Sequence, residues 1–269
     1  MSTKLLRSSL LWLAMGASLP AGAAPASAIS FAESPVRLVR DTGLYVAARG
    51  ARLQNGDLFE SGAGPIQLEG MGGPTVALGP ASRAYLQRSG DMVELTLLSG
   101  WLKVQTGAAA SSMSINSGKL RIKPESSSLI IQSVAGKTAL FVESGAPSVT
   151  EMQGTKALRT TKLAKEQYAV FSSKEPLKVL PRPKDFASTM PPAFFDPLVP
   201  LSFKGTAPEP KLERAAVFAT DVAPMLADDP AVFQVLNRRF NPPPKRSAPI
   251  APSASGAPDK PAPRDTPLY

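Results

Sequence analysis

Four glycines recur every eighteen residues, at Gly100, Gly118, Gly136 and Gly154. The residues around them repeat as well. Two aliphatic columns run through the repeats: Val104, Ile122, Leu140 and Leu158 follow the glycines, and Leu95, Met113, Ile131 and Val149 precede them. Because one short turn of β structure cannot bury its inner face alone, such columns predict stacked β units, here with an 18-residue rung period.

Polar and apolar residues alternate after each glycine, as in strands with one buried face. We expect an inward set of Leu102, Val104, Leu120, Ile122, Thr138, Leu140 and Val142. The positions between them predict an outward basic and aromatic stripe of Trp101, Lys103, Lys119, Arg121 and Lys137. In stacked rungs this stripe could bind a repeating anionic polymer, with Trp101 as a stacking platform. The alternative is a solvated face whose charges discourage edge association.

Residues 36–180 consist of short alternating segments separated by Gly, Ser, Asn and Pro, which predicts an all-β domain. With the repeat, we expect a β-solenoid or β-roll-like architecture. Residues 181–241 predict a proline-broken strap, with Phe194 and Phe195 docking a partner, and short helices capped by Asp221 and Asp229. In the last helix Phe233, Leu236 and Phe240 would share a face. Residues 242–269, rich in Pro, Ala and Ser, predict a disordered tail.

The N-terminus has the pattern of a secretory signal peptide over residues 1–28, with Lys4 and Arg7 before an apolar run. We expect cleavage after Ala28, with Ala23 as a second option and a retained anchor as the alternative. No later segment is long and apolar enough for a membrane span. The net charge of +9 suits anionic envelope components, whereas an export signal argues against nucleic acid as the partner.

The chain contains no His and no Cys, which excludes Ser-His-Asp and Cys-His catalysis and zinc sites built from those ligands. The closest acidic pairs, Asp57 with Glu60 and Asp228 with Asp229, have structural interpretations as a turn and a helix cap. We therefore expect a protein that is not an enzyme and that needs no cofactor or metal. A carbohydrate-active β-solenoid enzyme is the less favoured alternative.

Several segments together resemble the FecR-type periplasmic domain, over roughly residues 40–180. The resemblance rests on 52–57, 72–86, 95–104, 114–122, 140–149 and 163–167. The strap and the Leu236–Phe240 helix end are also similar in style to exported FecR-domain proteins. Sigma-regulating members carry an anti-sigma segment and a transmembrane helix before this domain, where this chain has the signal-peptide pattern.

These features predict a non-enzymatic periplasmic binding or scaffold protein of the cell envelope. Its partner would be peptidoglycan or another anionic glycan, or a periplasmic or outer-membrane protein. The alternative is an accessory of signalling between an outer-membrane receptor and a sigma factor.

Overall fold

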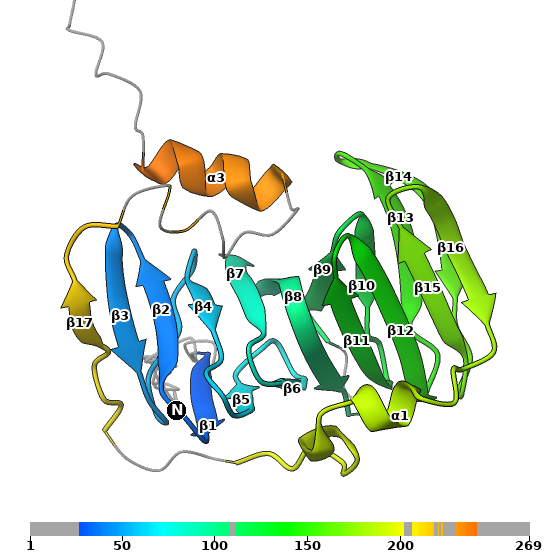
Figure 1. The fold of residues 1–269 in the computed structure, drawn as a ribbon, viewed down its shortest axis with the longest axis horizontal. Helices are drawn as coiled ribbons and strands as arrows, with labels where there is room; N and C mark the ends of the chain where they lie inside the picture. Colours follow the sequence, from blue (N-terminus) through cyan, green and yellow to red (C-terminus); the bar gives the residue numbers. More distant parts are fainter. Residues whose placement is uncertain are drawn as a thin grey trace, which may run out of the picture.

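Two β-sheets share one long strand and enclose a common core (Figure 1). The computed structural model describes residues 27–107, 111–201, 206–217, 220, 222 and 230–240. The signal segment up to residue 26, the capping residues Asp221 and Asp229, and the tail 242–269 lie outside this range. The prediction of a mostly β protein is confirmed.

Among the described residues, sheet A contains eight strand segments. In spatial order they are β1 (Ala28–Ala32), β5 (Ile66–Glu69), β6 (Thr75–Leu78), the second half of β8 (Met92–Gln105), β11 (Ser128–Val134), β12 (Lys137–Ser144), β15 (Tyr168–Ser172) and β16 (Glu175–Leu180).

Sheet B contains ten strand segments within the same described ranges. In order they are β17 (Lys211–Arg214), β3 (Gly43–Ala47), β2 (Val36–Arg40), β4 (Leu58–Glu60), β7 (Arg83–Ser89), the first half of β8, β9 (Met113–Ser117), β10 (Leu120–Lys123), β13 (Ser148–Gln153) and β14 (Lys156–Lys162).

Strand β8 passes from sheet B into sheet A near Gly100. Up to Ser99 it pairs with β7, and from Gly100 onward it pairs with β11. Gly100 has a φ of 91°, and a Cβ at this position would lie 2.7 Å from the Ser82 Cα atom. A side chain here would therefore meet both a strained conformation and a backbone clash, so glycine permits the bend.

The eighteen-residue repeat corresponds to hairpins rather than to stacked rungs. Gly118, Gly136 and Gly154 lie in the turns of the β9–β10, β11–β12 and β13–β14 hairpins. These hairpins belong in turn to sheet B, sheet A and sheet B, and β15–β16 returns to sheet A. Among the described strand pairs, only β8–β9 is parallel. The expectation of a β-solenoid is therefore corrected. The eighteen-residue period is ambiguous because a hairpin together with its connection to the other sheet has the same length in residues as one solenoid rung.

The inward set lies in the core as expected. Its seven side chains are at most 2% exposed. The six apolar members join one cluster with residues from both sheets, including Leu38, Phe59 and Leu86. Leu158, by contrast, lies on the edge strand β14 and is 57% exposed, so the aliphatic column ends before it.

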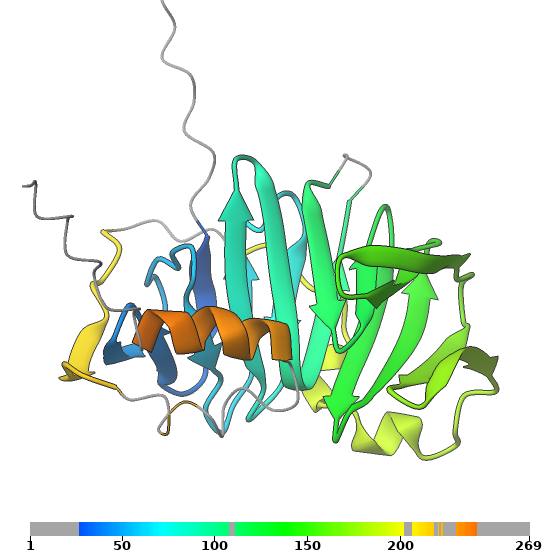
Figure 2. The same ribbon diagram turned by 90° about the horizontal axis from the view of Figure 1, so that it is seen from above.

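Each sheet also has a covered outer face. The strap, with α1 (Phe186–Thr189) and the 3₁₀ helix η1 (Pro192–Phe194), packs on sheet A through Phe186, Phe194 and Leu198. Helix α3 (Pro230–Phe240) lies across sheet B (Figure 2). Val232 and Leu236 are its buried residues, and Phe240 packs beside them. Leu236 and Phe240 therefore lie on the packed face as predicted, whereas Phe233 is 42% exposed and Val232 takes the expected place of Phe233.

The start of the described chain is integrated into the fold. The Ser27 side chain is fully buried, its hydroxyl donates to the Gly70 carbonyl at 3.1 Å, and its own carbonyl accepts from the Leu53 N–H at 2.8 Å. Cleavage after Ala28 would remove these contacts. Within the described residues, no helix has the length and apolarity needed to cross a membrane.

Candidate functional site

The predicted basic stripe is divided between opposite faces of the molecule. Trp101 and Lys103 lie on the outer face of sheet A, whereas Arg121 lies on the outer face of sheet B. The reason is the alternation of hairpins, since a step of eighteen residues moves a position to the other sheet. The stripe is therefore not a continuous surface.

The strap covers Trp101 and Lys103. The prediction that these two side chains are exposed is therefore wrong. The Trp101 ring lies 5.7 Å from the Phe186 ring. The Lys103 side chain is 1% exposed, and its Nζ contacts Glu143 at 2.9 Å and donates to the carbonyls of Phe194 at 2.7 Å and Asp196 at 3.0 Å. Lys103 therefore holds the strap rather than a ligand.

The two predicted docking phenylalanines have different environments. Phe194 is fully buried against sheet A, so it anchors the strap and cannot contact a partner. Phe195 is 57% exposed, and its role in docking stays a prediction.

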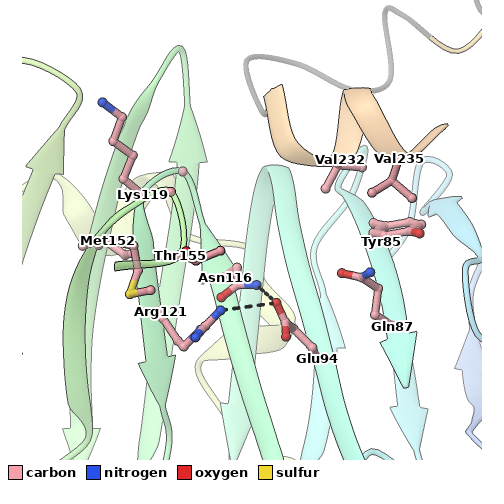
Figure 3. A pocket seen from close by; sticks show the side chains of 13 residues that line it. Tyr85, Gln87, Glu94, Asn116, Lys119, Arg121, Met152, Thr155, Val232 and Val235 are labelled. Carbon is pink, nitrogen blue, oxygen red and sulfur yellow. Dashed lines mark hydrogen bonds and ion pairs between the residues drawn. The ribbon is translucent and has the colours of Figure 1, made fainter. Parts of the chain in front are cut away.

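A groove of about 320 Å³ opens on the outer face of sheet B, between α3 and the hairpins β9–β10 and β13–β14 (Figure 3). Lys119 and Arg121 line it, as do Met152 and Thr155 on the β13–β14 side. Tyr85 and Gln87 of β7 form its floor towards α3, which contributes Val232 and Val235. The exposed Lys137 lies in the neighbouring hairpin, which contacts β9 through a 3.0 Å bond between the Thr138 and Ser117 hydroxyls.

The charged groups of the groove are only partly satisfied. Glu94 accepts a hydrogen bond from the Asn116 amide, and its Oε1 lies 4.0 Å from Arg121 Nη2. Arg121 Nε is buried and has no hydrogen-bond partner among the described residues. The Arg121 side chain as a whole is 42% exposed, so the terminal guanidinium nitrogens, rather than the buried Nε, are the donors that a ligand oxygen can reach.

Two further polar groups face the groove. The Gln87 side-chain amide forms no hydrogen bond with any residue that the structure describes, and the Lys119 ammonium group has no carboxylate partner within the same range. Together with Arg121, which is separated from Gln87 by strands β8 and β9, they present donors, an acceptor and positive charge along the groove.

Tyr85 forms the apolar base below α3. It is 2% exposed, and burial raises the pKa of its hydroxyl above 10, an effect that the nearby Arg239 guanidinium partly offsets. Arg239 also donates to the Gly56 carbonyl at 2.9 Å, which fixes the end of α3 on sheet B. The phenol therefore stays neutral at physiological pH.

Of the carboxylates considered as catalytic candidates, Asp57 and Glu60 serve the fold, and Asp228 and Asp229 lie outside the described residues. Asp57 is 1% exposed at its side chain and accepts two hydrogen bonds from the Arg40 guanidinium, at 2.8 and 3.0 Å. Glu60 pairs with Arg83 at 2.8 Å. Within the described part of the chain, no group of three or more His, Cys, Asp or Glu residues could hold a metal ion.

Sequence reasoning singled out Lys119 and Arg121 but missed Tyr85, Gln87 and Asn116. Tyr85 occupies an outward position of an alternating strand, and only the helix that covers it makes it part of a groove. Gln87 and Asn116 carry no pattern in the sequence that marks a site.

No protein-family model matches the chain, and no curated protein matches it. Two crystal structures from Parabacteroides distasonis ATCC 8503, each described as a "putative anti-sigma factor", are similar in part. They have TM-scores of 0.40 and 0.39 and sequence identities of 11% and 10%. The matches cover 49% and 47% of this chain and 62% and 60% of those chains, so this chain spans about three fifths of their length. Similarity at this level does not establish a shared function.

Proposed function

We propose that this protein is a non-enzymatic binding protein of the periplasm and that it holds an anionic envelope polymer or partner protein in the groove beside α3. The observation that carries the proposal is the set of weakly paired or unpaired donors that line this groove, namely the partly exposed Arg121 guanidinium, the Lys119 ammonium group and the Gln87 amide. Two cationic side chains beside a free side-chain amide favour an oxygen-rich anionic ligand.

The periplasmic location and the FecR-type family are part of this proposal and rest on the sequence pattern. The signalling-accessory alternative also stays a prediction, since nothing in the groove favours a relay over simple binding.

The test is a binding assay with two anionic polymers, soluble peptidoglycan fragments and polygalacturonate, at increasing salt. Affinity should fall with salt because exposed charges are screened beyond about 8–10 Å at physiological ionic strength. The double reversal Lys119→Glu with Arg121→Glu should abolish binding of whichever polymer the wild-type protein binds.

Lys123→Glu is the matched control, because Lys123 lies two residues along the same strand and is exposed but outside the groove. Equal loss in the control would mean that net charge, not the groove, governs binding. Undiminished binding by the double reversal would refute the site.

A further inference from the structure

The strap shows how this protein binds an extended segment through side-chain amides. The Gln105 amide accepts from the Leu198 N–H at 2.9 Å and donates to the Leu198 carbonyl at 3.3 Å. The Gln67 amide donates to the Val199 carbonyl at 2.7 Å. All three contacts are to the main chain, and the buried side chains of Phe194 and Leu198 supply apolar anchors.

The groove on sheet B has the same combination of groups on the opposite face. The Gln87 amide offers one donor side and one acceptor side, which match the C=O and N–H of a peptide group. Val235, 41% exposed, lies above Tyr85 and provides an apolar surface (Figure 3). Such a surface can take an aliphatic side chain from a bound segment.

Charge adds a third requirement on the ligand. Lys119 and Arg121 stand on the side of the groove opposite α3, and Glu94 offsets only part of their charge because its nearest Arg121 contact is 4.0 Å. A ligand carboxylate can pair with the exposed part of the Arg121 guanidinium, and Lys119, whose flexible side chain extends away from Arg121 in Figure 3, adds a second positive charge on the same side of the groove.

A glycan matches these groups less well. Sugar rings are held by exposed aromatic faces, yet Tyr85 is almost fully buried, and Trp101 is on sheet A against Phe186. The groove therefore lacks a stacking platform among its described residues.

We infer that the groove binds an extended acidic peptide segment of a partner protein. A carboxylate lies at Lys119 and Arg121, a main-chain amide lies at Gln87, and an aliphatic side chain packs against Val235. This inference rests on the proposed function and specifies the ligand of the same groove.

Fluorescence anisotropy with a library of labelled N-acetylated octapeptides tests it. Each peptide carries one Asp or Glu and one Leu or Val within three positions, and a second library replaces the acid by its amide. The acidic peptides should bind and the amide peptides should bind about tenfold more weakly or not at all. Gln87→Ala and Val235→Ser should each weaken binding by about fivefold to tenfold, and Arg121→Gln by about tenfold or more.

Two controls match these changes. Gln234→Ala removes an exposed amide from α3 outside the groove, and Val179→Ser removes an exposed valine from β16 in the other sheet. Both should leave affinity within about twofold of wild type.

The outcomes separate the two proposals. The peptide inference is overturned, and the proposed function stands, if Arg121→Gln weakens binding of polygalacturonate or peptidoglycan while no peptide binds. The same conclusion follows if Arg121→Gln weakens polymer binding while Gln87→Ala and Val235→Ser leave peptide affinity unchanged. If Arg121→Gln binds every probe as wild type does, the groove is not the site and both fail. Binding of acidic peptides with the expected losses supports both.

Discussion

Replacing Lys103 by Met should release the strap from sheet A. Met has nearly the same length but no charge and no N–H donor, so packing is retained while the Nζ contacts to Glu143, Phe194 and Asp196 are lost. The Phe194 carbonyl belongs to a fully buried residue, so water cannot replace its donor.

The magnitude follows from these contacts. Leaving the Phe194 carbonyl unsatisfied costs about 1–2 kcal/mol. Glu143 loses its cation, but its side chain is 25% exposed and keeps a 2.6 Å hydrogen bond from Ser128, so this loss is about 1 kcal/mol. The Asp196 carbonyl belongs to an exposed residue and adds little. We expect the free energy of unfolding to fall by about 2–3 kcal/mol.

Urea denaturation measures this change, and limited proteolysis locates it. Lys103→Met should be cut within residues 194–201 under conditions in which the wild-type strap is protected, because its local opening becomes more favourable. Lys178→Met is the control, since Lys178 is 50% exposed, and should cost under about 0.5 kcal/mol. A loss below 0.5 kcal/mol in Lys103→Met, with the strap still protected, would refute the reasoning and show that desolvation of the ammonium group cancels its contacts.

Three other predictions concern the core, pH and the N-terminus. Ile122→Ala or Leu140→Ala should cost about 2–4 kcal/mol in urea unfolding and Lys119→Ala under about 0.5, and similar small values would contradict the inward assignment. Burial raises the pKa of the Tyr85 hydroxyl, so the stability contributed by the neutral phenol is complete below pH 10 and is lost as pH rises through the folded-state pKa. The thermal midpoint should therefore fall more steeply above pH 10 in wild type than in Tyr85→Phe. Equal slopes in the two proteins would exclude ionisation of Tyr85 as the cause. If the chain is exported as proposed, N-terminal sequencing of the processed form should show cleavage after Ala23, which keeps Ser27, whereas a first residue of Ile29 would mean that the Ser27 contacts are dispensable.

Burial was the most predictable property of this chain. Leu102, Ile122 and Leu140 alternate with polar residues, and alternation places such side chains inside whether the strands form rungs or hairpins. Because the alternation is the same in rungs and in hairpins, it could not show the strand topology. Gly118 and Gly136 mark turns in both architectures, and only the pairing of strands shows that successive turns belong to different sheets.

The errors at the site follow from that topology. Lys103 and Arg121 are eighteen residues apart and were expected to be neighbours, but one lies under the strap and the other faces the groove. The groove itself combines Tyr85, Arg121 and Val235, which are far apart in the sequence and have no shared pattern. Their proximity depends on how α3 packs across sheet B, which local periodicity does not encode.

The alternation of hairpins between the sheets also limits how such a chain can change length during evolution. Loss or duplication of one unit, such as β11–β12, would place every later strand in the opposite sheet and turn its buried side chains towards the wrong partner. Removing or adding two consecutive hairpins preserves the sheet to which each later strand belongs. Relatives with this arrangement should therefore differ in size by pairs of hairpins, and a designed deletion of β11–β14 should be better tolerated than deletion of β11–β12 alone.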